Sequence, residues 1–192
     1  MGANDLIECV FATWSPVIGD PTFTGWVTVA AYVIAAYLAA GVFRVQSGRQ
    51  RIFWLGLSIC LLLLAINKQL DLQSALTAAG RCLAKTQGWY EERHAIQIKF
   101  ILAIIAANTV VAASLAWAMR REFTFIWPAL LGLVGLLAFI AIRAAGFHHF
   151  DQFIGFEIGG MRMNGILELG GIALIAANAV HLLLLNRRME DR

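Results

Sequence analysis

The chain has 192 residues, of which 60% are hydrophobic and 14% are charged, and its formal net charge is +3. Soluble domains carry roughly 25% charged residues, so this composition excludes an ordinary soluble domain and indicates an integral membrane protein. The length allows a single domain over residues 1–192. The sequence contains no nucleic-acid-binding motif, and its basic residues flank apolar stretches, so nucleic acid is excluded as a partner.

Five apolar stretches follow one another along the chain. Each has about 20 residues, which is long enough to cross a hydrocarbon core of about 30 Å. Helix is the expected state, because backbone polar groups in lipid must find their hydrogen bonds within the segment. The sequence therefore predicts an all-α bundle of five transmembrane helices, at about residues 23–43, 52–70, 95–119, 127–146 and 165–186.

Basic residues are unevenly distributed between the two sides of this bundle. Eight arginines flank the spans on one side: Arg44, Arg49, Arg51, Arg120, Arg121, Arg187, Arg188 and Arg192. Four basic residues are spread over the loops of the other side: Arg81, Lys85, Arg93 and Arg162. Because basic residues accumulate in cytoplasmic loops, we expect the N-terminus outside and the C-terminus in the cytoplasm. The first 22 residues contain no lysine or arginine, so we expect no cleavable signal peptide.

Polar residues at the end of the second span are the first candidates for a site at the outer face. The helical pattern continues beyond Leu70. Asn67 is four residues and Lys68 three residues before Asp71, so all three can share one helical face. One interpretation is a Lys68–Asp71 ion pair with the lysine extended to the interface. The other makes Asp71 a metal ligand and Lys68 a binding group for an anionic substrate.

A Glu-x-x-His pair opens the third span. Glu91 and His94 are three residues apart, which turns both side chains to one face of a helix. This spacing supplies two metal ligands in di-metal carboxylate bundles, although those sites use two such pairs. The alternative is a charged helix N-terminus, where glutamate interacts favourably with the helix dipole.

The fourth and fifth spans add further ionisable groups. Arg143 lies near the outer end of the fourth span and needs a partner at that depth. His148, His149 and Asp151 come next and lie within a stretch of four residues, and imidazole and carboxylate groups are common zinc ligands. Glu168, near the start of the fifth span, either pairs with Arg143 or acts as a general acid or base with a raised pKa.

Two of the three cysteines, Cys9 and Cys82, are expected on the outer side. An oxidising compartment would allow them to form a disulfide. Nothing in the sequence shows that the two cysteines are close, so the sequence does not decide whether this disulfide forms. Cys60 lies inside the second span and is expected to be an apolar filler.

The stretches Ile66–Gln73 (INKQLDLQ) and Gly88–Arg93 (GWYEER) resemble segments of small, functionally uncharacterised bacterial inner-membrane proteins. The resemblance covers about a quarter of the chain. It implies a multi-pass protein of the bacterial inner membrane and carries no activity with it.

The first functional hypothesis is a membrane hydrolase with zinc or another divalent metal at the outer, periplasmic face, acting on a lipid or amphiphile. Its metal ligands would be drawn from Asp71, His94, His148, His149 and Asp151. Glu91 or Glu168 would be the general base on metal-bound water, and Lys68 or Arg143 would hold an anionic headgroup.

The alternative hypothesis is a non-catalytic protein: an accessory subunit of a larger membrane complex, or a lipid- or quinone-binding module. It would work as a homo-oligomer or with partner membrane subunits, and its outer charges would form ion pairs within the bundle. A third possibility is a b-type haem between His94 and His148 or His149. Transport is disfavoured, because no span has the paired central breaks of a midplane site.

Overall fold

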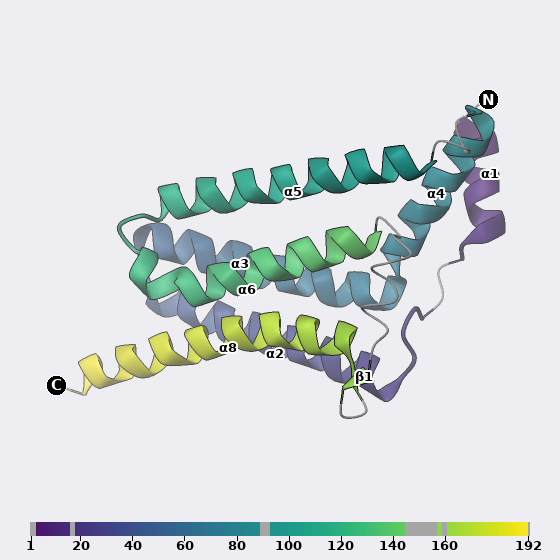
Figure 1. Ribbon diagram of the computed structural model, residues 1–192. Helices are drawn as coiled ribbons and strands as arrows, with labels where there is room; N and C mark the ends of the chain where they lie inside the picture. The colour runs from purple at the N-terminus through teal and green to yellow at the C-terminus, as the bar shows by residue number, and fades with distance from the viewer. Residues whose placement is uncertain (1–2, 16–17, 89–92, 145–156, 159–160, 192) are drawn as a thin grey trace.

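The computed structural model describes residues 3–15, 18–88, 93–144, 157–158 and 161–191 (Figure 1). Five of its helices are long and apolar enough to cross a membrane. They are α2 (Phe23–Val45), α3 (Gly48–Leu70), α5 (Arg93–Ala118), α6 (Phe123–Ala144) and α8 (Met163–Glu190). The shorter elements are α1 (Ala3–Thr13), α4 (Leu72–Thr86) and the antiparallel pair β1 (Glu157–Ile158) and β2 (Met161–Arg162). The predicted helical, multi-pass bundle is confirmed.

The break between α3 and α4 differs from the prediction. The helical pattern was expected to continue through Asp71, but Asp71 has a φ of 47°, in the left-handed region. Aspartate tolerates this conformation because its short polar side chain can bond locally. Here the Asp71 carboxylate accepts a hydrogen bond from Ser74 Oγ at 2.5 Å, and its carbonyl accepts one from the Ser74 N–H at 3.0 Å. The chain therefore changes direction at Asp71, and α4 leaves α3 at an angle (Figure 1).

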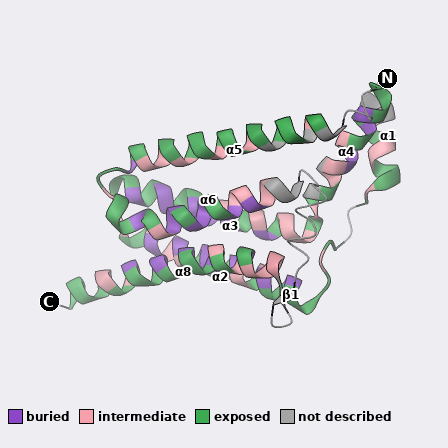
Figure 2. Cartoon of the chain, viewed as in Figure 1, coloured by how far each residue is buried: buried purple, intermediate pink, exposed green. Residues whose placement is uncertain are grey.

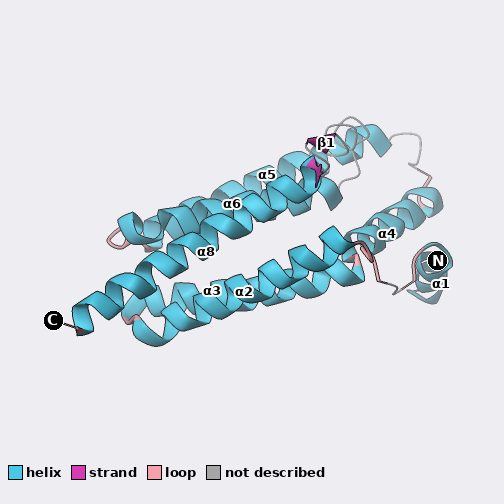
Figure 3. Cartoon of the chain, turned by 90° about the horizontal axis from the view of Figure 1, so that it is seen from below, coloured by secondary structure: helices cyan, strands magenta, loops and turns pink. Residues whose placement is uncertain are grey.

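The long helices form two layers. One contains α2 and α3, and the other contains α5, α6 and α8 (Figure 3). The layers meet where α2 packs against α8. The core between them combines small residues of α2 with large side chains, of which Tyr32, Trp54, Leu61, Ile126 and Ile175 are fully buried. This packing brings the ends of α2, α3 and α8 together.

Helix α5 lies at the edge of the bundle. Its apolar stretch Ile98–Ala118 contains no buried residue in the described part of the chain, and most of its surface is exposed (Figure 2). Its principal neighbour is α6. In a bilayer its side chains would contact hydrocarbon or another protein chain, so α5 contributes little to the described site.

The two ends of the bundle carry different elements. We call the end with α1 and α4 the outer end, and the end with Val45, Ala118 and the C-terminus the inner end, following the arginine distribution; the orientation itself stays a prediction. At the outer end a Cys9–Cys82 disulfide, with a Cα–Cα distance of 6.1 Å, joins α1 to α4. The disulfide that the sequence left open is therefore formed.

Candidate functional site at the outer end

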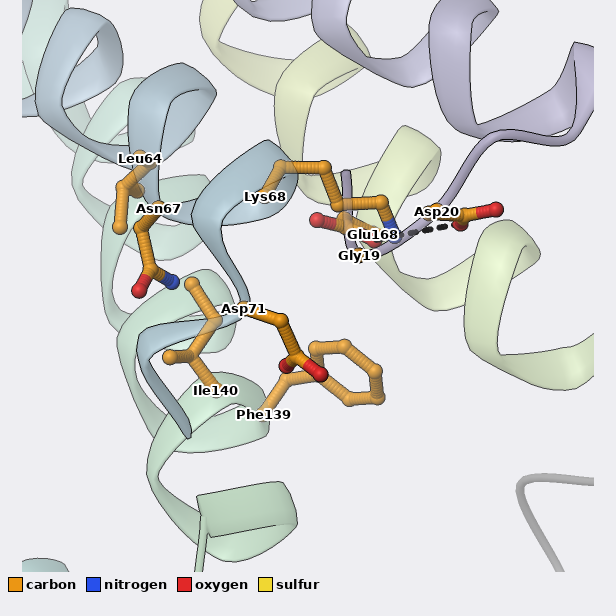
Figure 4. Close-up of a pocket in the computed structure, with 9 residues that line it drawn as sticks. All are labelled: Gly19, Asp20, Leu64, Asn67, Lys68, Asp71, Phe139, Ile140 and Glu168. Atoms are coloured by element: carbon orange, nitrogen blue, oxygen red, sulfur yellow. Dashed lines mark hydrogen bonds and ion pairs between the residues drawn. The ribbon is translucent and has the colours of Figure 1, made fainter. Parts of the chain in front are cut away.

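Lys68, in the last turn of α3, lies between two carboxylates (Figure 4). Its Nζ is 2.9 Å from Glu168 Oε2 and 3.5 Å from Asp20 Oδ2. The side chains of Lys68 and Glu168 are only 9% and 4% exposed. A charge this deep in the bundle would be costly without a partner. The Lys68–Glu168 ion pair therefore joins α3 to α8. The second ion pair, with Asp20, connects the segment before α2 to the end of α3.

Tyr32 is hydrogen-bonded to the other carboxylate oxygen of Glu168. The fully buried Tyr32, in α2, donates a hydrogen bond from its hydroxyl to Glu168 Oε1 at 3.0 Å. Both carboxylate oxygens of Glu168 thus have a donor in the described structure, one from α2 and one from α3. A hydrogen bond to a charged group contributes roughly 1.5–3 kcal/mol. We call Asp20, Tyr32, Lys68 and Glu168 the outer ion network.

Asp20 lies just before α2, outside the membrane-spanning helices. Partial burial raises the pKa of its carboxyl, but a hydrogen bond from Thr22 and the charge of Lys68 outweigh burial and hold the pKa below its usual value. Thr22 Oγ1 donates to Asp20 Oδ1 at 2.5 Å. Asp20 is therefore held ionised beside Lys68.

A small hollow adjoins this network. Its lining consists of Gly19, Asp20, Leu64, Asn67, Lys68, Asp71, Phe139, Ile140 and Glu168 (Figure 4). The space inside is about 20 Å³, which is enough for about one water molecule. Among the described lining residues, three carboxylates accompany one ammonium group, which gives this set a formal charge of −2. The hollow suits a water or a single cation and is too small for the headgroup of an amphiphile.

The segment before α2 packs closely against the junction of α3 and α4 at Asp71. The Gly19 N–H donates to the Gln69 carbonyl at 2.7 Å, so the segment before α2 lies directly against the end of α3. A Cβ at position 19 would lie 2.5 Å from Asp71 Cβ, so only glycine fits at this position without a clash. The short approach keeps Asp71 close to Asp20 in the fold.

Three of the nine predicted site residues are described with their side chains. Lys68, Asp71 and Glu168 all line the hollow, although they come from two helices and the junction between α3 and α4. One expected pairing is wrong: among the described side chains Lys68 pairs with Glu168 and Asp20 rather than with Asp71. Glu168 has Lys68 and Tyr32 as partners, and its predicted pairing with Arg143 stays a prediction because the Arg143 side chain lies outside the described structure.

The remaining predicted residues are only partly described. His94 lies in the first turn of α5 and Arg143 in the last turn of α6, but their side chains are outside the described structure. Glu91, His148, His149 and Asp151 lie outside the described residues altogether. Within the described part of the chain, no three His, Cys, Asp or Glu side chains are grouped to hold a metal ion. The predicted ligand set thus stays a prediction.

Two members of the outer ion network were not predicted from the sequence. Tyr32 is a polar aromatic residue in an alanine-rich span, where the small neighbours Ala35, Ala36 and Ala39 let another helix approach closely. A buried hydroxyl needs a hydrogen-bond partner, and this requirement could have indicated Tyr32 as a site residue. Asp20 belongs to a short acidic segment that gave no comparable signal.

Comparisons of the chain with models of protein families, with curated proteins and with solved structures find no match. The interpretation of the site therefore depends on its own residues and their geometry.

Proposed function

We propose that this chain is a membrane enzyme that holds a divalent metal ion, zinc in the first instance, at the outer end of the bundle and hydrolyses a lipid or another amphiphile. The charge of the hollow carries this proposal. Among the described lining residues Asp20, Asp71 and Glu168 are accompanied by one cationic group, Lys68, and the excess negative charge favours a cation. The size of the hollow also suits a single ion. A bacterial inner membrane is part of the proposal.

Asp71 is the described residue best suited to be a ligand, because its carboxylate belongs to the hollow and takes no part in the pairing of Lys68. We assign the other ligands to His94, His148, His149 and Asp151, and the general base to Glu91. Metal ions lower the pKa of a bound water and so supply a nucleophile at neutral pH. The amphiphile would approach from the outer leaflet, with only its reacting group near the hollow.

The roles of Lys68 and Glu168 change in this proposal. Lys68 is already neutralised by two carboxylates, so an anionic headgroup would gain little from it. Arg143 takes that role instead. Glu168 has both oxygens engaged by Tyr32 and Lys68, which gives it a positioning role beside the metal rather than the role of a free base.

A second candidate function, the non-catalytic one, is favoured by the same network. Lys68, Glu168 and Tyr32 satisfy one another inside the fold, as expected if the outer charges only hold the helices together. The chain would then be an accessory subunit or a lipid- or quinone-binding module, as a homo-oligomer or with partner subunits.

Metal analysis separates the two candidates. Protein purified in detergent, exposed to zinc and freed of excess metal by dialysis should retain stoichiometric metal. Asp71→Asn should lower the retained amount, and asparagine keeps the left-handed backbone that position 71 requires. The double variant His148→Ala/His149→Ala should lower it further.

Asp191→Asn at the inner end removes the same charge and provides the matched control, with retention unchanged. A wild-type protein that retains no metal would rule out the enzyme and leave the accessory role.

A further inference from the structure

A second, larger recess lies at the inner end of the bundle, between the last turns of α2 and α8. Its volume is about 410 Å³, within the range of about 300–1,000 Å³ that small-molecule sites occupy. The lining residues on which ligand binding would depend are Tyr37, Leu38, Gly41, Arg44, Leu183 and Arg187. We call this recess the inner groove. It lies at the opposite end of the bundle from the outer ion network.

The inner groove is lined by both apolar and basic side chains. Leu38 and Leu183 line its apolar part, and Gly41 lies between the two helices, where a Cβ would meet Leu183 Cδ1 at 3.5 Å. Arg44 in α2 and Arg187 in α8 both lie in the last turn of their helices. From Tyr37 to Arg44 the helix rises about 10 Å, at 1.5 Å for each of seven residues.

The net charge of the groove is positive. Glu190 also lines it, but its carboxylate accepts a hydrogen bond from the Asn186 amide at 2.9 Å. Two guanidinium groups therefore face one carboxylate, which leaves a formal charge of +1. Guanidinium groups bind phosphate through paired N–H donors, and they are weakly hydrated, which suits them to a membrane interface.

We propose that the inner groove binds an anionic phospholipid. Its phosphate lies between Arg44 and Arg187, and the upper part of an acyl chain lies along Leu38, Gly41 and Leu183. Charge complementarity and position select this occupant: both arginines lie in the last turn of a helix long enough to cross a membrane, where lipid phosphates are expected. Basic recesses between transmembrane helices are typical sites for anionic headgroups. The proposal is independent of the metal site.

The test measures lipid binding to the full-length protein in detergent by native mass spectrometry. Wild-type protein should retain phosphatidylglycerol in preference to phosphatidylcholine. Arg44→Gln/Arg187→Gln should weaken phosphatidylglycerol binding at least about tenfold, because each interfacial arginine contributes on the order of 1 kcal/mol. Arg121→Gln/Arg188→Gln removes the same charge outside the groove and should bind as wild type does.

A second pair of variants tests the apolar part without changing charge. Gly41→Leu should fill the groove and weaken binding, whereas Gly56→Leu, at an exposed position of α3 with no atom near its Cβ, should not. Equal losses in the two arginine pairs would overturn the proposal, as would equal retention of the two lipids. Displacement of the lipid by inorganic phosphate at similar concentration would also overturn it, since the occupant would then be a free anion.

Discussion

Lys68 and Glu168 are separated by 100 residues in the chain, yet each is the main counter-ion of the other. Both side chains are almost completely buried, so the loss of either one should lower the stability of the protein strongly. Removing one member of a buried pair leaves an uncompensated charge, which costs about 3–5 kcal/mol, whereas replacing both can be nearly neutral.

Lys68→Met should therefore destabilise the protein by about 3 kcal/mol, because the carboxylate of Glu168 must either stay charged without a counter-ion or take up a proton. Lys68→Met/Glu168→Gln should recover most of this loss. Unfolding in detergent followed by circular dichroism measures both. Lys99→Met, at an exposed position of α5, removes the same charge and should change stability by less than about 0.5 kcal/mol. A double variant no more stable than the single one would contradict the pairing.

The pH dependence of stability should contain a contribution from Asp20. Its pKa in the folded protein lies below the usual value of 3.8, so the unfolded chain binds more protons in this window. The stabilisation is complete above about pH 3.8 and is lost as the pH falls through the lower, folded value. The difference in melting temperature between wild type and Asp20→Asn should shrink between about pH 5 and about pH 3. A difference that stays constant over this range would rule out the contribution.

At the scale of helices, α6 and α8 lie close together at two glycines. A Cβ at Gly132 would lie 2.5 Å from the Gly171 carbonyl oxygen, and one at Gly171 would lie 2.8 Å from Leu136 Cγ. Small residues allow this approach in membrane helices. The close packing sets the position of α8, and through it the position of Glu168.

Asn178 strengthens the same contact. Its amide donates to the Phe125 carbonyl at 2.9 Å and its oxygen accepts from the Ala129 N–H at 3.3 Å, so it completes hydrogen bonds of α6 close to Pro128. Asn178 therefore joins α8 to α6 through its side chain. α6 begins at Phe123, which places Pro128 in the second turn of the helix.

Gly132→Ala should destabilise the bundle by about 1–3 kcal/mol, because the added methyl group meets a backbone carbonyl that cannot rotate away. Gly135→Ala, one turn along α6, is the control: no atom lies within 4 Å of its Cβ position. Alanine there should be neutral or slightly stabilising, since it favours helix more than glycine does. Melting temperatures in one detergent compare the two, and equal effects would argue against the close contact.

At the scale of the whole molecule, the disulfide connects α1 to the rest of the outer end. Cys9 and Cys82 are 73 residues apart, and α4 is the main neighbour of α1 among the described elements. A crosslink over so long a segment restricts the unfolded chain and raises stability.

Cys9→Ser/Cys82→Ser should lower stability by about 2–4 kcal/mol, and a reducing agent should lower it in wild type by a similar amount. Unfolding with and without reductant measures the effect. Cys60→Ser is the control, because Cys60 is a free thiol in α3. Wild-type protein insensitive to reductant would show that the bond contributes nothing to the fold.

The sequence by itself determined the five membrane-spanning helices and the common end of Lys68, Asp71 and Glu168. Both follow from local properties: each apolar run is long enough to cross a bilayer and satisfies its own backbone, and the order of crossings assigns polar residues to an end. These properties are readable without knowing which helices are neighbours.

Only the tertiary structure decided the partners. Glu168 bonds to Tyr32 and Lys68, Cys9 bonds to Cys82, and Asn178 bonds to α6, and every one of these pairs lies more than 40 residues apart. Hydropathy does not encode which helices pack together, because lipid-facing and core-facing surfaces are equally apolar. Small residues at the helix contacts select the neighbours, and the neighbours then determine which charges meet.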